Sequence, residues 1–129
     1  MHLEPSSVPV LHLEHGRFVQ IYCDKVSTPD APISLLRGVR PPHVGGNCHV
    51  HDTETEIFIG ISGTGTLILD GQACTVGPGT VAWAMPGVRH ELRNDGDEEF
   101  SYYALFTPPV SLEHIRENAR RLADENSRI

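Results

Sequence analysis

Hydrophobic and polar residues alternate over short distances from Arg17 onward, which is the pattern of β-strands with one buried face. Turn sequences rich in glycine, proline and aspartate separate these runs, and the Asp70-Gly71 pair is typical of a tight hairpin. Nine short strands at this spacing predict a sandwich or a barrel. The predicted strands are residues 18–23, 33–40, 48–51, 57–61, 66–69, 72–76, 80–84, 90–93 and 100–106.

The two ends of the chain have a different character from its centre. Residues 1–16 predict a lead-in with one edge strand near residues 8–13, and residues 17–107 predict the barrel itself. After Pro108-Pro109, residues 108–129 predict a helix capped by Ser111 that ends at about residue 123 and is followed by a polar tail. Its apolar positions repeat at helical spacing: Leu112, Ile115, Ala119 and Leu122. The expected fold is therefore all-β with a C-terminal α-helix.

Charge and cysteine content limit the environment and the partners of the chain. Its 129 residues carry a formal net charge of −7, which argues against nucleic acid and anionic membranes as partners. No apolar run is long enough to cross a bilayer, and the first ten residues do not resemble a signal peptide. The three cysteines are widely spaced and odd in number. We therefore expect a cytoplasmic protein with reduced thiols.

Histidine and glutamate side chains cluster in the stretch His49-Val50-His51-Asp52-Thr53-Glu54-Thr55-Glu56. On a strand, His49 and His51 would point to the same face, about 6–7 Å apart. If the chain then turns back, Glu56 arrives beside this pair at the start of the next strand. His90 opens a later strand, and a closed sheet would bring its face toward the same interior. Because polar groups are costly to bury unpaired, a cluster of this kind indicates either an exposed surface or a bound cation.

Both segments resemble the two signature motifs of the cupin superfamily. The internal spacing fits from His49 onward in the first motif and throughout the second. Two positions depart from the pattern: Gly46 is nearer to His49 than the usual glycine, and Met85 stands where the second motif usually has a proline. The resemblance extends over about residues 33–107. The positions that carry it are Gly46, His49, His51, Glu56 and Gly63 in the first motif and Gly79, Gly87, His90 and Asn94 in the second.

This resemblance implies a double-stranded β-helix, a jelly-roll-like barrel, with one divalent metal ion in its interior. The implied metal ligands are His49, His51, Glu56 and His90, and Glu56 acts either as a ligand or as a nearby catalytic base. Three imidazoles and one carboxylate suit Fe, Mn, Ni, Zn or Cu better than calcium or magnesium. The resemblance also implies a small-molecule substrate and favours a homodimer, formed through the apolar stripe of the helix or the N-terminal strand.

The resemblance leaves the reaction open. The leading expectation is a dioxygenase-like oxidoreductase that binds a small organic metabolite and O₂ at the metal. The first alternative is a redox-neutral isomerase, lyase, decarboxylase or cyclase in which the metal acts as a Lewis acid. The second alternative is a non-catalytic module that binds a small molecule, because fold alone does not decide function.

Several further residues are candidates for the pocket. One or two aromatic residues are expected to line it, from the set Phe58, Trp83, Tyr102, Tyr103 and Phe106. Arg37 and Arg40 lie on or beside one strand, and either could hold a substrate carboxylate, although a solvated arginine is the commoner case. Asn94 is expected to form hydrogen bonds at the barrel rim. His114 is assigned to the surface and Cys48 to the core.

Overall fold

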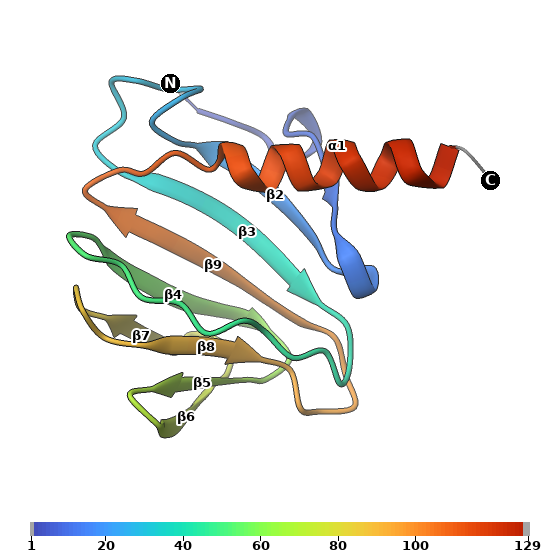
Figure 1. The fold of residues 1–129 in the computed structure, drawn as a ribbon. Helices are drawn as coiled ribbons and strands as arrows, with labels where there is room; N and C mark the ends of the chain where they lie inside the picture. The colour runs from blue at the N-terminus through green and yellow to red at the C-terminus, as the bar shows by residue number, and fades with distance from the viewer. Residues whose placement is uncertain (1, 128–129) are drawn as a thin grey trace.

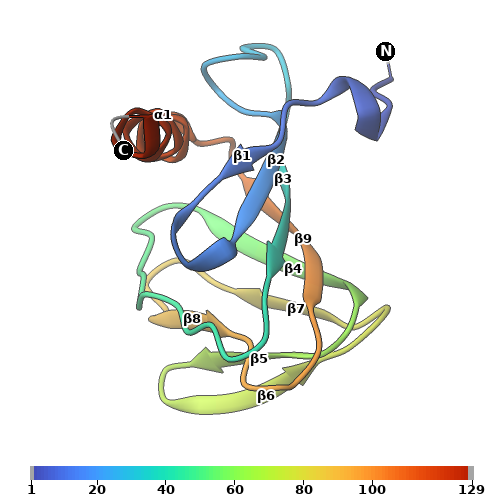
Figure 2. The same ribbon diagram turned by 90° about the vertical axis from the view of Figure 1, so that its right-hand side faces the viewer.

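The structure, a computed structural model that describes residues 2–127, consists of two facing antiparallel β-sheets and one helix, α1 (Glu113–Ser127). The larger sheet has the order β1-β2-β3-β9-β4-β7, and Figure 1 shows most of these strands side by side. The smaller sheet, of order β6-β5-β8, lies across from it in Figure 2. The predicted all-β barrel with a C-terminal helix is therefore confirmed. The strands are β1 (Leu11–His12), β2 (Phe18–Cys23), β3 (Ser34–Arg40), β4 (Thr55–Ser62), β5 (Gly65–Leu69), β6 (Gln72–Val76), β7 (Val81–Ala84), β8 (His90–Arg93) and β9 (Phe100–Thr107).

The core fills the space between the two sheets. Its largest members come from both sheets, and Phe100 and Leu67 are completely buried. Leu112, just before α1, is 1% exposed and ties the start of the helix to this core. Burial of such side chains supplies the main driving force of the fold. The core residues are Val19, Leu36, Phe58, Leu67, Val76, Leu92, Phe100, Tyr102, Ala104, Phe106 and Leu112.

The Asp70-Gly71 pair forms the turn between β5 and β6, as the sequence predicts. Both residues have positive φ angles, 45° for Asp70 and 83° for Gly71. This is the conformation that a two-residue hairpin turn requires at both central positions, and glycine adopts it without steric cost.

The strand predicted at residues 48–51 is wrong. Within residues 48–51 the backbone pairs with β8 at one isolated bridge, between His49 and His90, and a second bridge joins Val44 to Asn94, just after β8. His49 lies five positions after Val44, whereas Asn94 lies four positions after His90, so one extra residue interrupts the ladder on this side. Cys48 is therefore exposed rather than part of the core, which corrects that prediction as well.

The two ends also differ from the prediction in their bounds. β1 is limited to Leu11–His12, within the predicted range of 8–13. α1 continues to Ser127, past the predicted end near residue 123. Arg121 lies 4.0 Å from Glu125 one turn later, a contact that favours this extension. Among residues 2–127 no helix has the length and apolar character needed to cross a membrane.

A buried aspartate fixes the position of α1 over the barrel. Asp24, which follows β2, is fully buried, and one of its carboxylate oxygens accepts a hydrogen bond of 2.7 Å from the backbone N–H of Leu112. The guanidinium of Arg116 donates to both carboxylate oxygens, at 3.0 and 2.9 Å. The start of the helix is thus held by a segment almost ninety residues earlier in the chain.

Candidate metal centre and pocket

Glu56 is the centre of a buried polar cluster between the two sheets. It opens β4, and its side chain points inward next to Phe58 on the same face. Its Oε1 accepts hydrogen bonds from Nε2 of His51 at 3.1 Å and from Nε2 of His90 at 2.9 Å. Possible ligand atoms of these three residues all lie within 4.8 Å of one another. The structure therefore brings together three of the four residues that the motifs predict as ligands.

His49 lies beside this cluster but is not part of its hydrogen bonds. Its backbone is fixed by reciprocal bonds with His90, of 2.7 and 2.8 Å. Its ring lies 6.1 Å from the ring of His90 and 6.4 Å from that of His51, measured between centroids. His49 therefore borders the cluster, and its role as a fourth ligand stays a prediction.

The cluster shifts the pKa values of its members in opposite directions. Burial by itself raises the pKa of Glu56, but the hydrogen bonds from His51 and His90 outweigh burial and lower it. Burial lowers the pKa of His90, but its hydrogen bonds with Glu56 and with the carbonyl of Val88 outweigh this and raise it. For His49, burial is the main cause of a lowered pKa. Without a cation, Glu56 is thus a carboxylate bridging two imidazoles.

The donor set fits a divalent transition metal. Nitrogen and oxygen ligands at about 2.0–2.2 Å from one ion lie about 3–4 Å from each other, and the Nε2 atoms of His51 and His90 are 3.1 and 2.9 Å from Glu56 Oε1. An ion bound between these two imidazole nitrogens and the carboxylate would take the place of their hydrogen bonds. Nitrogen donors of this kind favour transition metals over calcium or magnesium.

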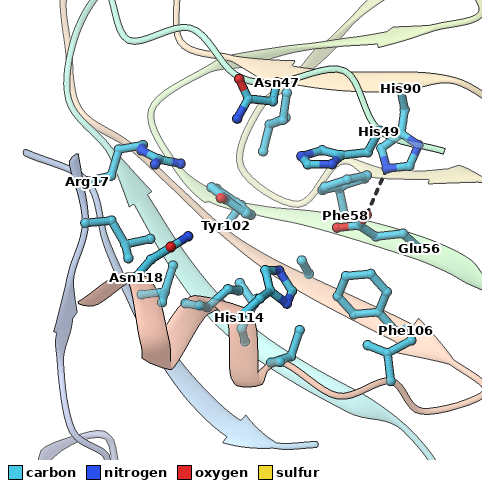
Figure 3. A pocket seen from close by; sticks show the side chains of 18 of the residues that line it. Arg17, Asn47, His49, Glu56, Phe58, His90, Tyr102, Phe106, His114 and Asn118 are labelled. Atoms are coloured by element: carbon cyan, nitrogen blue, oxygen red, sulfur yellow. Dashed lines mark hydrogen bonds and ion pairs between the residues drawn. The ribbon is translucent and has the colours of Figure 1, made fainter. Parts of the chain in front are cut away.

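The cluster opens into a cavity of about 340 Å³. Figure 3 shows Glu56, His90 and His49 at one side of this cavity and Arg17 at the other, with Tyr102 between them in this view. The first turns of α1 form another wall, from which His114 and Asn118 reach toward the space. A concave site of this size, with polar groups converging on it, is typical of small-molecule binding.

The aromatic candidates divide between the inside and the outside of the barrel. Phe58, Tyr102 and Phe106 line the cavity, one more than expected. Trp83 on β7 does not line it and is 55% exposed. Tyr103 follows Tyr102 along β9 and therefore faces the opposite side of the sheet.

The remaining candidates are also placed by the structure. Arg40 lines the cavity, whereas Arg37 on the same strand donates to Gln20 at 3.2 Å and does not line it. The amide nitrogen of the buried Asn94 donates to the carbonyls of Arg40, Pro41 and Glu98, at 3.0, 3.0 and 2.8 Å. Asn94 therefore forms rim hydrogen bonds, as predicted.

The sequence did not indicate several residues of the cavity wall, among them Arg17, His114 and Asn118. His114 is exposed, as predicted, but it also reaches the cavity. Arg17 precedes β2, and the other two lie on α1, so none belongs to a motif. The spacing of His114 and Asn118, four residues apart on a helix, places them on one face. This spacing was the only available signal, and it does not indicate what that face contacts.

Comparison with solved structures agrees with this fold. KdgF from Halomonas sp. superposes with a TM-score of 0.73 at 16% identity, covering 84% of this chain and 93% of that chain. A Cupin 2 conserved barrel domain protein from Salinispora arenicola gives a TM-score of 0.65 at 27% identity, covering 94% of this chain and 98% of the other.

Among curated proteins, the glucose-6-phosphate isomerase of Thermococcus kodakarensis is 35% identical over 66 residues, which make up 47% of this chain. The chain covers 35% of the length of that relative. Residues 38–106 match the sequence model of the cupin domain. Because this match includes more than half of the chain, the protein belongs to the cupin family.

Proposed function

We propose that this cupin is a metal-dependent enzyme that moves a proton on a small carbonyl compound without net oxidation, as an isomerase or a lyase does. The observation that carries this proposal is the convergence of His51, Glu56 and His90 on one point at the wall of a partly open cavity. His49 is proposed as the fourth ligand. The bound ion would supply Lewis acidity toward a carbonyl or hydroxyl oxygen.

The redox-neutral reaction is favoured over a reaction with O₂ by two further side chains of the cavity. His114 and the hydroxyl of Tyr102 line the space, and neither side chain has a hydrogen-bond partner within residues 2–127. Both can donate a proton, and a neutral His114 can also accept one. Glu56 is a third group that can take up a proton. The isomerase named among the curated relatives supports the same choice.

An assay that does not require the natural substrate to be known tests this proposal. A panel of small hydroxycarbonyl compounds is incubated in D₂O under argon with the metal-loaded protein, and deuterium incorporation next to the carbonyl is followed by NMR. We expect incorporation with at least one compound, and its loss in Glu56→Gln and His90→Ala. His12→Ala is a matched control, because His12 is exposed and does not line the cavity. Turnover that requires air and consumes O₂ would instead establish the oxidoreductase.

We also propose a homodimer, formed by the outer face of β4 and β7. Ile57 and Ile59 on β4 pair with Trp83 and Val81 on β7, and the latter two are 55% and 52% exposed. An apolar strip of this kind marks an interaction surface. A second copy fits it because the strip is uncharged and can pair with itself about a two-fold axis. The start of the helix stripe is already used inside the chain, where Leu112, just before α1, and Ile115 pack on the core.

A further inference from the structure

Two arginines line the cavity without a carboxylate partner. Arg17 donates through Nε to the backbone carbonyl of Glu14 at 3.1 Å, and its terminal nitrogens bond to nothing within residues 2–127. Arg40 donates through Nη1 to the carbonyl of Gly45 at 2.9 Å. Neither forms an ion pair with any of the carboxylates that the structure describes, although the chain has 17 acidic residues. The side chain of Glu14 at this end contacts Arg121 instead, at 3.5 Å.

The charge of these two arginines is only partly satisfied by the protein. Nε of Arg40 is buried and has no hydrogen-bond acceptor among the described residues. A buried charged donor without an acceptor is destabilising. Burial lowers the pKa of Arg17 and the positive charge of Arg40 lowers it further, and together they outweigh the opposite effects of Tyr102 and Glu14. The two guanidinium groups are therefore near enough to repel each other, and an anion between them would relieve this repulsion.

Neutral hydrogen-bond donors stand beside Arg17. In the view of Figure 3, Asn118 lies on the same side of the cavity as Arg17, and Tyr102 lies between Arg17 and the Glu56 side. The Tyr102 ring reaches this position by crossing Gly38, where an added Cβ would lie 2.5 Å from its hydroxyl oxygen. Guanidinium, hydroxyl and amide donors together match the oxygens of a carboxylate or phosphate.

We infer that Arg17 and Arg40 form an oxyanion subsite, so that the substrate carries a carboxylate or a phosphate at the end distant from the metal centre. This inference rests on the proposed function only in assigning the other end of the substrate to the metal centre. Arg17 and Arg40 would fix the orientation of the substrate. The metal centre at Glu56 would then meet its uncharged end. We expect a substrate analogue that lacks the carboxylate or phosphate to bind weakly.

Binding of two simple anions to the metal-free protein tests the subsite. Chelator-treated protein is titrated at constant ionic strength with inorganic phosphate and with malonate, and the dissociation constants are measured by calorimetry. We expect one of the two anions to bind, with affinity about tenfold or more weaker in Arg17→Gln and in Arg40→Gln. Arg37→Gln is the matched control, since it removes the same charge from the same strand but on a side chain that bonds to Gln20. Its affinity should stay within twofold of the unmodified protein.

The relative affinities for the two anions distinguish a phosphate from a carboxylate as the group that the subsite binds. Tighter binding of phosphate assigns a phosphate ester, and tighter binding of malonate assigns a carboxylic acid. If neither anion binds, or if Arg37→Gln weakens binding as much as Arg17→Gln, the inference is overturned.

A measurement on the unmodified protein covers the case of a variant that does not fold. The Nε–H resonances of Arg17 and Arg40 should shift on titration in ¹⁵N NMR spectra, and those of Arg37 should not. Unchanged Arg17 and Arg40 resonances would also overturn the inference. Because no metal is present, these results do not depend on the deuterium assay. Deuterium exchange without anion binding would reject only the oxyanion subsite. Anion binding without deuterium exchange would reject only the proposed reaction.

Discussion

Arg116 on α1 holds both carboxylate oxygens of Asp24, at 3.0 and 2.9 Å, and Asp24 is fully buried. Burial raises the pKa of the Asp24 carboxyl, but the hydrogen bonds from Arg116, Ser27 and Leu112 outweigh it and hold this pKa far below the ordinary value. The carboxylate therefore stays ionised in the folded protein and fixes the helix that walls the cavity.

Replacing Asp24 with Asn should lower the free energy of unfolding by about 3 kcal/mol at pH 7, since a buried ion pair then loses one partner. The loss is measured by urea denaturation. Arg120→Ala is the control, because its contact with Glu113 is exposed and should contribute less than about 1 kcal/mol. Equal losses in the two variants would show that Asp24 does not anchor the helix.

The stabilisation from Asp24 should depend on pH. Its pKa is lowered in the folded state, so its contribution is complete above the unfolded value of about 4 and decreases as the pH falls below that value. The difference in unfolding free energy between the unmodified protein and Asp24→Asn should therefore narrow as the pH falls from about 5 to about 3, a range that spans the unfolded-state pKa. A difference that widens in acid would contradict the assignment.

Metal affinity should fall as the pH is lowered through the neutral range. The pKa of His90 is raised in the metal-free protein, so its ring carries a proton at a higher pH than an ordinary histidine. A ligating imidazole must be neutral, and binding therefore releases this proton. Calorimetry in two buffers of different ionisation enthalpy measures the release. Binding without proton release at pH 6.5, a value near the ordinary histidine pKa of about 6.5, would argue that His90 is not a ligand.

Gly38→Ala should displace Tyr102, because the new Cβ would meet the ring 2.5 Å away. Overpacking of this kind costs about 1–3 kcal/mol, which thermal or urea unfolding detects. Gly45→Ala is the control, since no atom lies within 4 Å of the Cβ built there. In a Tyr102→Ala background the Gly38→Ala change should cost little, and a full cost there would contradict this explanation.

Trp83→Glu should convert the proposed homodimer into a monomer, which light scattering coupled to gel filtration would show. The substitution places a charge in the apolar strip of β4 and β7, where the paired copy would have to bury it. Val26→Glu is the control, as Val26 is equally exposed, at 54%, but lies outside the strip. A monomeric unmodified protein, or a dimer that Trp83→Glu leaves intact, would reject this interface.

The sequence predicted the strands well because alternation and turn residues are local signals. Eight of the nine runs after residue 16 lie in strands of the structure. The failure at residues 48–51 has a non-local cause, since the extra residue between Val44 and His49 can be counted only against its partner β8. The convergence of His51, Glu56 and His90 was accessible because the resemblance to the cupin motifs implies it.

The opposite wall of the cavity was not accessible in the same way. His114 and Asn118 reach the cavity because α1 is held against the barrel by Asp24. No local pattern around either residue encodes that packing. Arg40 was considered for substrate binding along with Arg37, and only the orientation of each side chain in the folded sheet distinguishes the two.

The helix wall has a consequence for how this protein can change over evolutionary time. The proposed metal ligands belong to the β-barrel and the segment beside it, whereas Asn118 belongs to a helix joined to the barrel by one short connection. Substitutions at Asn118 can alter which molecule fits while the metal ligands stay untouched. The ion site and part of the wall that selects the substrate are thus inherited on separate parts of the chain.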